Sequence, residues 1–234
     1  MPEGNILQNS YDLLYALKQL DYLKTGRDPL WWPNSNTFEV VVGTLLTQQT
    51  KWERVEESLE NLKVHDLLTL EALSNASIQE IARLIKPSGF YNTKAQRLKL
   101  LCTNILNEFG SFEVFKKQVD REWLLTQKGI GMESADSILC YGCGREVFVV
   151  DSYTNRVLQA FGYQFENYMQ IQEWMQEGIE ANFDKITRLY DIPVTLHTVY
   201  ARFHGKIVEF SKEHIRGKNV DIKPLISHSK KGTS

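Results

Sequence analysis

Apolar residues recur at intervals of three and four along most of the chain, which is the spacing of one face of an α-helix. The clearest run has five apolar side chains at positions i, i+3, i+4, i+7 and i+8: Phe38, Val41, Val42, Leu45 and Leu46. Asn36 and Glu39 stand at the spacing of a capping box, so we expect the start of this helix there.

The same periodicity predicts helices through the rest of the chain, and the fold class we expect is all-α. Asn9 and Ser10 are candidate caps of the first helix. Residues 147–150 form an apolar run too short and isolated for a sheet, so we interpret them as a buried connector, and we expect disorder from Ser227 onward. The other helices are expected at residues 11–20, 53–62, 66–73, 77–85, 95–106, 112–118, 120–127, 132–143, 152–161, 167–180, 184–190 and 193–216.

Composition is that of a soluble globular protein, with 42% hydrophobic and 24% charged residues among 234. No apolar run reaches the length of a membrane span, and the first residues lack the order of a signal peptide, so we expect a cytoplasmic protein, nucleoid-associated if bacterial. The net charge of −2 argues mildly against nucleic acid unless cations gather locally. Each candidate basic patch is equally consistent with a solvated helix face: Lys94/Arg97/Lys99, Lys116/Lys117 and Lys206/Lys212/Arg216/Lys218.

Three cysteines are too few for a disulfide framework. Cys140 and Cys143 form a C-x-x-C pair, but there is no second pair and no suitably spaced histidine, so a closed zinc site lacks ligands. We expect no metal and interpret both thiols as small buried hydrophobic groups.

Two polar or aromatic segments leave structural and functional readings open. Trp31 and Trp32 lie between two prolines, where regular structure is not expected, and serve either as core plugs or as a platform for a ligand. The cluster at residues 47–51, Thr-Gln-Gln-Thr-Lys, follows a strongly apolar helix. Its amides either satisfy the carbonyls of the helix end or face a polar ligand.

A Gly129-Ile130-Gly131 turn separates two predicted helices. Neither glycine carries a Cβ, so the backbone can approach another molecule closely. The N–H groups at the start of the following helix point outward with the positive end of its dipole, which favours an anion such as phosphate. A tight turn that binds nothing explains the same glycines equally well.

Residues 127–135 followed by Val149-Val150-Asp151 resemble the hairpin and catalytic aspartate of the helix–hairpin–helix DNA glycosylases of the endonuclease III superfamily. Residues 38–50 and His204-Gly205-Lys206 extend the resemblance. It implies a two-domain fold with the active site in the cleft between the domains. The domains would be residues 34–145, ending in the hairpin, and residues 1–33 plus 146–234.

The resemblance also implies a role for each site residue. Asp151 would be catalytic and the partner would be double-stranded DNA, bound by a monomer. Gln49, or failing that Gln48, would fill the space left by an extruded base. The sequence does not decide whether the hairpin carbonyls hold a monovalent cation. The residues expected to contact DNA are Gln48, Gln49, Lys128, Gly129, Ile130, Gly131, Met132 and Ser134.

Two departures narrow the expected chemistry. Bifunctional relatives carry a nucleophilic lysine where this chain has Glu133, and a carboxylate cannot form an imine, so we expect a glycosylase without lyase activity. The chain has no cysteine beyond Cys143, which leaves no four-cysteine site for the iron–sulfur cluster of many relatives. No cofactor is therefore expected.

Both departures, with Trp31-Trp32-Pro33 and the segments around residues 50–52 and 201–212, resemble the MagIII-type 3-methyladenine DNA glycosylases. That implies a base pocket in which Trp31 and Trp52 stack on a flipped 3-methyladenine while Trp32 and Pro33 shape the wall. Lys206 and Lys212 would line it, and a cation facing a cationic base must be paired, pKa-shifted or modified. The alternatives are another damaged or mismatched base, or a non-catalytic DNA-binding protein.

Overall fold

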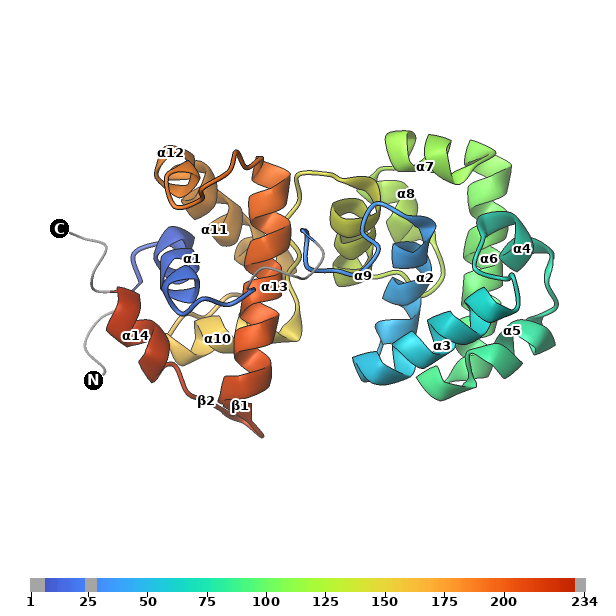
Figure 1. Ribbon diagram of the computed structural model, residues 1–234, viewed down its shortest axis with the longest axis horizontal. Helices are drawn as coiled ribbons and strands as arrows, with labels where there is room; N and C mark the ends of the chain where they lie inside the picture. Colours follow the sequence, from blue (N-terminus) through green and yellow to red (C-terminus); the bar gives the residue numbers. More distant parts are fainter. Residues whose placement is uncertain (1–6, 24–28, 230–234) are drawn as a thin grey trace. The chain divides into compact units, whose positions relative to one another are not determined.

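The computed structural model describes residues 7–23 and 29–229. Their regular secondary structure is almost entirely helical, which confirms the all-α prediction (Figure 1). The chain divides into two compact units, Asn34–Arg145 and a unit built from both ends of the chain, residues 1–33 with 146–234. Among the described residues, no helix is both long enough and apolar enough to cross a membrane.

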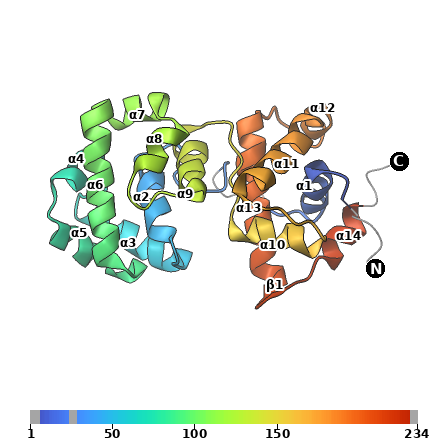
Figure 2. The same cartoon turned by 180° about the vertical axis from the view of Figure 1, so that it is seen from behind.

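The unit built from both chain ends packs around its longest helix, α13 (Leu196–His214), which α1 (Ser10–Gln19) and α10 (Ser152–Ala160) both contact (Figures 1 and 2). Five aromatic or aliphatic side chains of α13 are fully buried in the core of this unit: Val199, Tyr200, Phe203, Ile207 and Phe210. The remaining elements are α11 (Tyr168–Glu180), α12 (Phe183–Thr187), β1 (Ile215–Arg216), β2 (Asn219–Val220) and α14 (Lys223–Ser229).

The other unit is built around α2 (Phe38–Thr47), whose apolar side chains are almost all buried against α3 (Trp52–Val64), α6 (Tyr91–Phe109) and the hairpin helix. That helix begins as α9 (Met132–Ser137) and widens into a π-helical turn, η2 (Ile138–Gly142), that packs on α2. The remaining elements are α4 (Leu70–Asn75), α5 (Ile78–Leu84), the 3₁₀ turn η1 (Lys86–Ser88), α7 (Phe112–Gln118) and α8 (Arg121–Thr126).

The capping box predicted at Asn36 and Glu39 is wrong. The N-cap of α2 is Thr37, which makes no side-chain cap bond. Glu39 instead accepts a hydrogen bond from the side-chain amide of Asn34, and Asn36 has a left-handed φ of 65°. The helix start is stabilised mainly by burial of its apolar face, which does not require a box.

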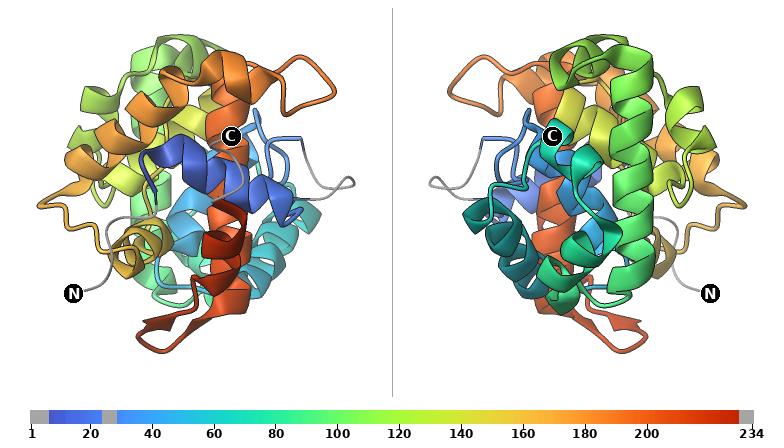
Figure 3. Two further views of the ribbon diagram at one scale, coloured as in Figure 1. Left: turned by 90° about the vertical axis from the view of Figure 1, so that its left-hand side faces the viewer. Right: turned by 90° about the vertical axis from the view of Figure 1, so that its right-hand side faces the viewer.

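The C-terminal prediction missed an antiparallel hairpin, β1–β2, and a last helix. Figure 3 shows the hairpin projecting from the end of α13. The expected disorder from Ser227 is wrong for residues 227–229, because α14 runs to Ser229 with Leu225 fully buried in the core. Residues 230–234 lie outside the described residues.

Two other predictions are confirmed. Residues 147–150 form no regular structure, and Phe148, Val149 and Val150 are buried. Cys140 and Cys143 are buried thiols, and burial raises the pKa of Cys143 to about 12, so they act as apolar packing groups.

Candidate active site

Asp151 is the N-cap of α10, where its side chain serves two purposes. Its Oδ1 accepts hydrogen bonds from the backbone N–H and the hydroxyl of Thr154, each at 2.8 Å. Its Oδ2 lies 3.6 Å from Nε2 of His204, an ion-pair distance that is too long for a good hydrogen bond. The carboxylate is thus fixed at one oxygen, and the other faces the imidazole.

The carboxyl of Asp151 is only 12% exposed. Burial acts to raise its pKa, but His204 and the two bonds from Thr154 outweigh it, so the pKa stays below the ordinary value of 3.8. The side chain is therefore ionised at neutral pH despite its burial. A negative charge held in this way is available to stabilise a cation or to accept a proton.

Trp31 lies against the same stretch of α13. Its backbone has a left-handed φ of 78°. The indole packs so closely on Gly205 that a Cβ there would come within 2.4 Å of Cγ of Trp31. Its ring meets the His204 ring edge to face, with centroids 5.3 Å apart. His204 therefore contacts both Asp151 and Trp31, which brings these two predicted site residues together within one unit.

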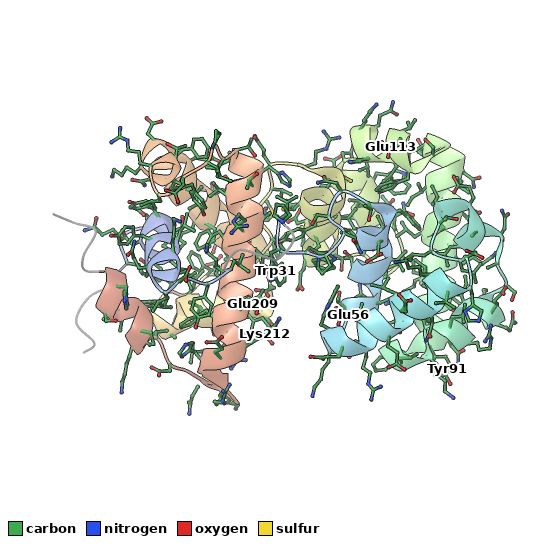
Figure 4. The ribbon with its side chains drawn as sticks, in the orientation of Figure 1. Trp31, Glu56, Tyr91, Glu113, Glu209 and Lys212 are labelled. Carbon is green, nitrogen blue, oxygen red and sulfur yellow. The ribbon has the colours of Figure 1, made fainter. Side chains whose placement is uncertain are left out.

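The polar edge of Trp31 is bound by a carboxylate. The indole Nε1 donates to Oε1 of Glu209 at 2.9 Å, and Nζ of Lys212 donates to the same oxygen at 3.0 Å. Figure 4 shows Glu209 and Lys212 next to each other on α13, with Trp31 beside them. Lys212 is thus paired with a carboxylate, one of the three conditions expected for a lysine near a cationic base.

The other predicted pocket residues of this unit are placed differently. Trp32 is 8% exposed and meets Trp31 edge to face at 6.2 Å, and Pro33 is exposed. Lys206 is 4% exposed and donates to the backbone carbonyl of Tyr22. Burial, with smaller contributions from nearby cations, lowers the pKa of Lys206 to about 8. Its ammonium is directed to Tyr22, just after the C-terminal end of α1, whereas the ammonium of Lys212 is directed to Glu209.

The Gly-Ile-Gly turn of the helix–hairpin–helix, residues 129–131, lies in the unit Asn34–Arg145, and its two glycines differ. Gly129 has a left-handed φ of 88°, and a Cβ there would lie 2.5 Å from Cδ of Arg97. Gly131, the N-cap of α9, has an ordinary extended conformation, and a Cβ there would meet nothing within 4 Å. The fold explains the first glycine, whereas nothing in the described part of the chain requires a glycine at the second position.

Gln48 is bound to the hairpin. Its side-chain amide donates to the carbonyl of Gly129 at 2.9 Å and to the hydroxyl of Ser134 at 3.1 Å. Gln49, the next residue, is exposed and has a left-handed φ of 56°. Of the two glutamines, one fixes the turn after α2 to the hairpin and the other extends into solvent.

The remaining predicted contacts lie on the surface of this unit or just beneath it. Lys128 is exposed, Ile130 is 7% exposed and Met132 is 36% exposed. Trp52 is half-buried at the first position of α3. Glu133, which stands where relatives carry a nucleophilic lysine, is exposed in the first turn of α9.

The candidate basic patch Lys94/Arg97/Lys99 is wrong for Lys94, which is buried, and its other two side chains are only partly exposed. Lys94 is 3% exposed, and Lys99 donates to the carbonyls of Ser74 and Ala76 at the end of α4. Arg97 lies along Gly129, and its buried Nε has no hydrogen-bond partner within the described part of the chain.

Sequence reasoning missed the parts that His204, Glu209 and Lys94 play. The sequence marks His204 only as part of the His204-Gly205-Lys206 motif, and it presents Glu209 as one of many charged residues on a long helix. The one available signal for Glu209 was chemical, since a buried indole N–H normally finds an acceptor. Among the described residues there is no group of three or more His, Cys, Asp or Glu side chains able to hold a metal ion.

Comparison with known proteins finds a matching family, similar sequences and similar structures. The family model described as HhH-GPD superfamily base excision DNA repair protein matches residues 42–181. A Methanocaldococcus jannaschii protein named as a candidate DNA repair glycosylase, MJ1434, is 36% identical over 220 residues, which cover 90% of this chain and 92% of the relative.

Two solved structures are similar over most of the chain. The H. pylori 3-methyladenine DNA glycosylase MagIII bound to 1,N6-ethenoadenine has a TM-score of 0.86 and 46% identity, covering 89% of this chain and 100% of that one. A trapped endonuclease III–DNA covalent intermediate has a TM-score of 0.67 and 17% identity, covering 97% and 100%, which supports the fold alone.

Proposed function

This chain belongs to the HhH-GPD superfamily of base excision DNA repair proteins, in which it is a DNA glycosylase, and we propose that it releases 3-methyladenine from alkylated DNA without cleaving the strand. The observation that carries the proposal is Asp151, a buried carboxylate kept ionised by His204 and Thr154. The similarity to MagIII supports the choice of an alkylated purine.

Methylation at N3 places a positive charge on adenine and weakens the N-glycosidic bond. The base then leaves without strong acid catalysis, and the transition state requires a negative charge near the oxocarbenium-like sugar. Asp151 supplies that charge. Because Oδ1 is occupied by two bonds from Thr154, Oδ2 is the oxygen that takes a proton from the attacking water.

The absence of lyase activity follows from Glu133. Strand cleavage in bifunctional relatives begins with an amine that attacks the sugar and forms an imine. At the corresponding position this chain has a carboxylate, which cannot form that intermediate. Release of the base by water is the step left to the enzyme.

The base pocket is proposed to contain Trp31, Trp32, Pro33 and Trp52, with Lys206 and Lys212 nearby. Flat electron-rich rings attract a flat cation by about 0.5–2 kcal/mol per contact. The pairing of Lys212 with Glu209 removes the repulsion that a bare lysine would exert on such a base. The burial of Lys206, with its ammonium on the Tyr22 carbonyl, supports a role for that lysine beneath the pocket.

DNA binding is proposed at the hairpin, through Lys128, Gly129, Ile130, Gly131, Met132 and Ser134. The open space above Gly131 supports close approach of a phosphate. Gln49 is proposed to fill the space left by the extruded base, since it is exposed while Gln48 is held by Gly129 and Ser134. A monovalent cation held by the hairpin carbonyls is compatible with this arrangement, and we expect a monomer to act alone.

The deciding experiment is incubation of the protein with methylated duplex DNA, followed by chromatography of the released bases. We expect free 3-methyladenine with the wild type and none with Asp151→Asn, which should still bind the duplex. No released purine would exclude the proposed activity. A covalent protein–DNA adduct trapped with borohydride would contradict the argument from Glu133.

A second candidate substrate is 1,N6-ethenoadenine, the base bound in the similar MagIII structure. The same assay on a duplex that contains this base separates the two. Release of ethenoadenine alone would replace the proposed lesion but leave the reaction unchanged.

A further inference from the structure

Lys94 lies on α6 with its side chain turned into the unit, and it is 3% exposed. Its ammonium donates three hydrogen bonds of 2.8 Å, to the carbonyl of Leu46, the hydroxyl of Thr50 and the carbonyl of Ser88. An ammonium has three donors, and all three are used. Its acceptors come from two chain segments, the end of α2 with the turn that follows it, and the turn η1.

These acceptors enclose the turn that carries Gln49. Leu46 lies three residues before Gln49, at the end of α2, where a cation also interacts favourably with the helix dipole. Thr50 follows Gln49 directly, and its hydroxyl donates to the Ser88 carbonyl at 2.5 Å. Lys94 therefore joins both ends of the turn to η1.

The backbone of the turn needs such support. Gln49 has a left-handed φ of 56°, a conformation that a non-glycine residue adopts at a cost and keeps only when its surroundings enforce it. Gln48 is held on one side by its bonds to Gly129 and Ser134. On the other side, the bonds of Lys94 to Leu46 and Thr50 hold the flanking residues.

An apolar side chain would fill the same space at a lower cost. Burial lowers the pKa of Lys94 to about 8, yet its three acceptors are two carbonyls and a hydroxyl, and none of them carries a charge. A buried cation without a carboxylate partner contributes little to stability, and such groups are retained in some proteins because they specify one conformation. Here the conformation specified is that of the turn.

We propose that Lys94 is a positioning residue for base extrusion, which holds the turn after α2 so that Gln49 projects into the space a flipped base leaves in duplex DNA. The proposal rests on the proposed glycosylase activity. It predicts that Lys94 matters for a base that must be extruded from a duplex. Release of the same base from a single strand, where there is no stack to fill, should not need it.

The test uses one methylated single strand, either alone or annealed to its complement, so that the lesion content of both substrates is the same. Single-turnover release of 3-methyladenine is measured for the wild type, Lys94→Met and Lys99→Met. Lys99 is the matched control, because it also lies on α6 and also donates to carbonyls at a helix end, that of α4, away from the turn.

We expect Lys94→Met to lose about tenfold or more of its rate on the duplex, the effect of losing hydrogen bonds from a charged group. On the single strand its rate should stay within about twofold of the wild type, as should the rate of Lys99→Met on both substrates. Equal losses on both substrates would show a merely structural role and overturn the proposal. An unchanged duplex rate would overturn it too.

If Lys94→Met does not fold, Thr50→Val provides a second test of the same turn. This variant removes one acceptor of Lys94 and the bond to Ser88, and we expect the same preference for the single strand at a smaller size. A Thr50→Val enzyme with equal losses on both substrates would contradict the role of the turn. If the wild type releases no base from either substrate, the proposed function itself fails, which is a distinct result.

Discussion

Trp31 and Lys212 donate hydrogen bonds to the same oxygen of Glu209, at 2.9 and 3.0 Å. Trp31, which is predicted to stack on the base, and Lys212, which is predicted to line the pocket, are thus joined by Glu209, for which the sequence pattern predicts no role. One consequence is geometric, because the bond fixes the rotation of the indole. The other is electrostatic, because Lys212 is part of a pair with Glu209 that carries no net charge.

The first prediction concerns this pair. Glu209→Gln keeps an oxygen that can accept from the indole but leaves the charge of Lys212 unbalanced. We expect release of cationic 3-methyladenine to fall about tenfold relative to release of uncharged 1,N6-ethenoadenine, as one charge at moderate distance predicts. Lys212→Met should shift the ratio in the opposite direction. The measurement is single-turnover release of both bases.

Glu213→Gln serves as the control, since Glu213 is on the same helix but accepts from the hydroxyl of Tyr22 instead. Its ratio should equal that of the wild type. A ratio that moves the same way in Glu209→Gln and Lys212→Met would rule out an electrostatic role for the pair.

The second prediction concerns the pH dependence of Asp151. Its pKa in the folded protein is below 3.8, so the stabilisation and the catalytic charge are present above that value and are lost as the pH falls through the folded pKa. The wild type should therefore show no acid limb from Asp151 above about pH 4. In His204→Ala the burial that raises the pKa is less opposed, so the acid limb should move to higher pH.

The measurement for this second prediction is the pH–rate profile of base release. His197→Ala is the matched control, two turns before His204 on α13, and should have the wild-type profile. A His204→Ala profile that overlays the wild type at lower amplitude would mean that the imidazole positions other groups and leaves the titration of Asp151 unchanged.

Most helices and the Gly-Ile-Gly turn were predictable because their signals are local. Apolar spacing along α2 and α13 reflects burial of one face, and the Gly-Ile-Gly turn follows from backbone freedom over three residues. The bond from Trp31 to Glu209 joins residues 178 positions apart, and nothing in either neighbourhood specifies the partner. The pattern that marks Lys94 as polar likewise does not tell an exposed cation from a buried one.

The third prediction separates the two hairpin glycines. Gly131→Ala should lose less than about 1 kcal/mol of stability, the cost of alanine in place of glycine at a helix N-cap, because its φ is ordinary and a Cβ meets open space. It should bind duplex DNA about tenfold more weakly if a phosphate approaches there. Gly129→Ala should lose stability, because of its left-handed φ and the contact with Arg97. Thermal unfolding and fluorescence anisotropy report the two effects.

Equal DNA affinity in Gly131→Ala and the wild type would remove the argument that an external group approaches this glycine. Full stability in Gly129→Ala would show instead that the Arg97 side chain moves aside without cost.

The last prediction concerns Lys206, whose pKa is lowered by burial to about 8 from 10.5. Between these values the unfolded chain carries a proton on this lysine that the folded protein lacks, so the free energy of unfolding should rise with pH. Tyrosines and cysteines whose pKa is raised act in the opposite direction, as Cys102 does. The effect is therefore expected in a difference, wild type minus Lys206→Met, which should increase by up to about 1.4 kcal/mol per pH unit from pH 8 to 10.5.

Urea unfolding at several pH values measures it, with Lys218→Met, an exposed lysine, as the control. A difference that stays constant over this range would mean that Lys206 keeps its proton in the folded protein, and its bond to the Tyr22 carbonyl would then have to stabilise a buried charge.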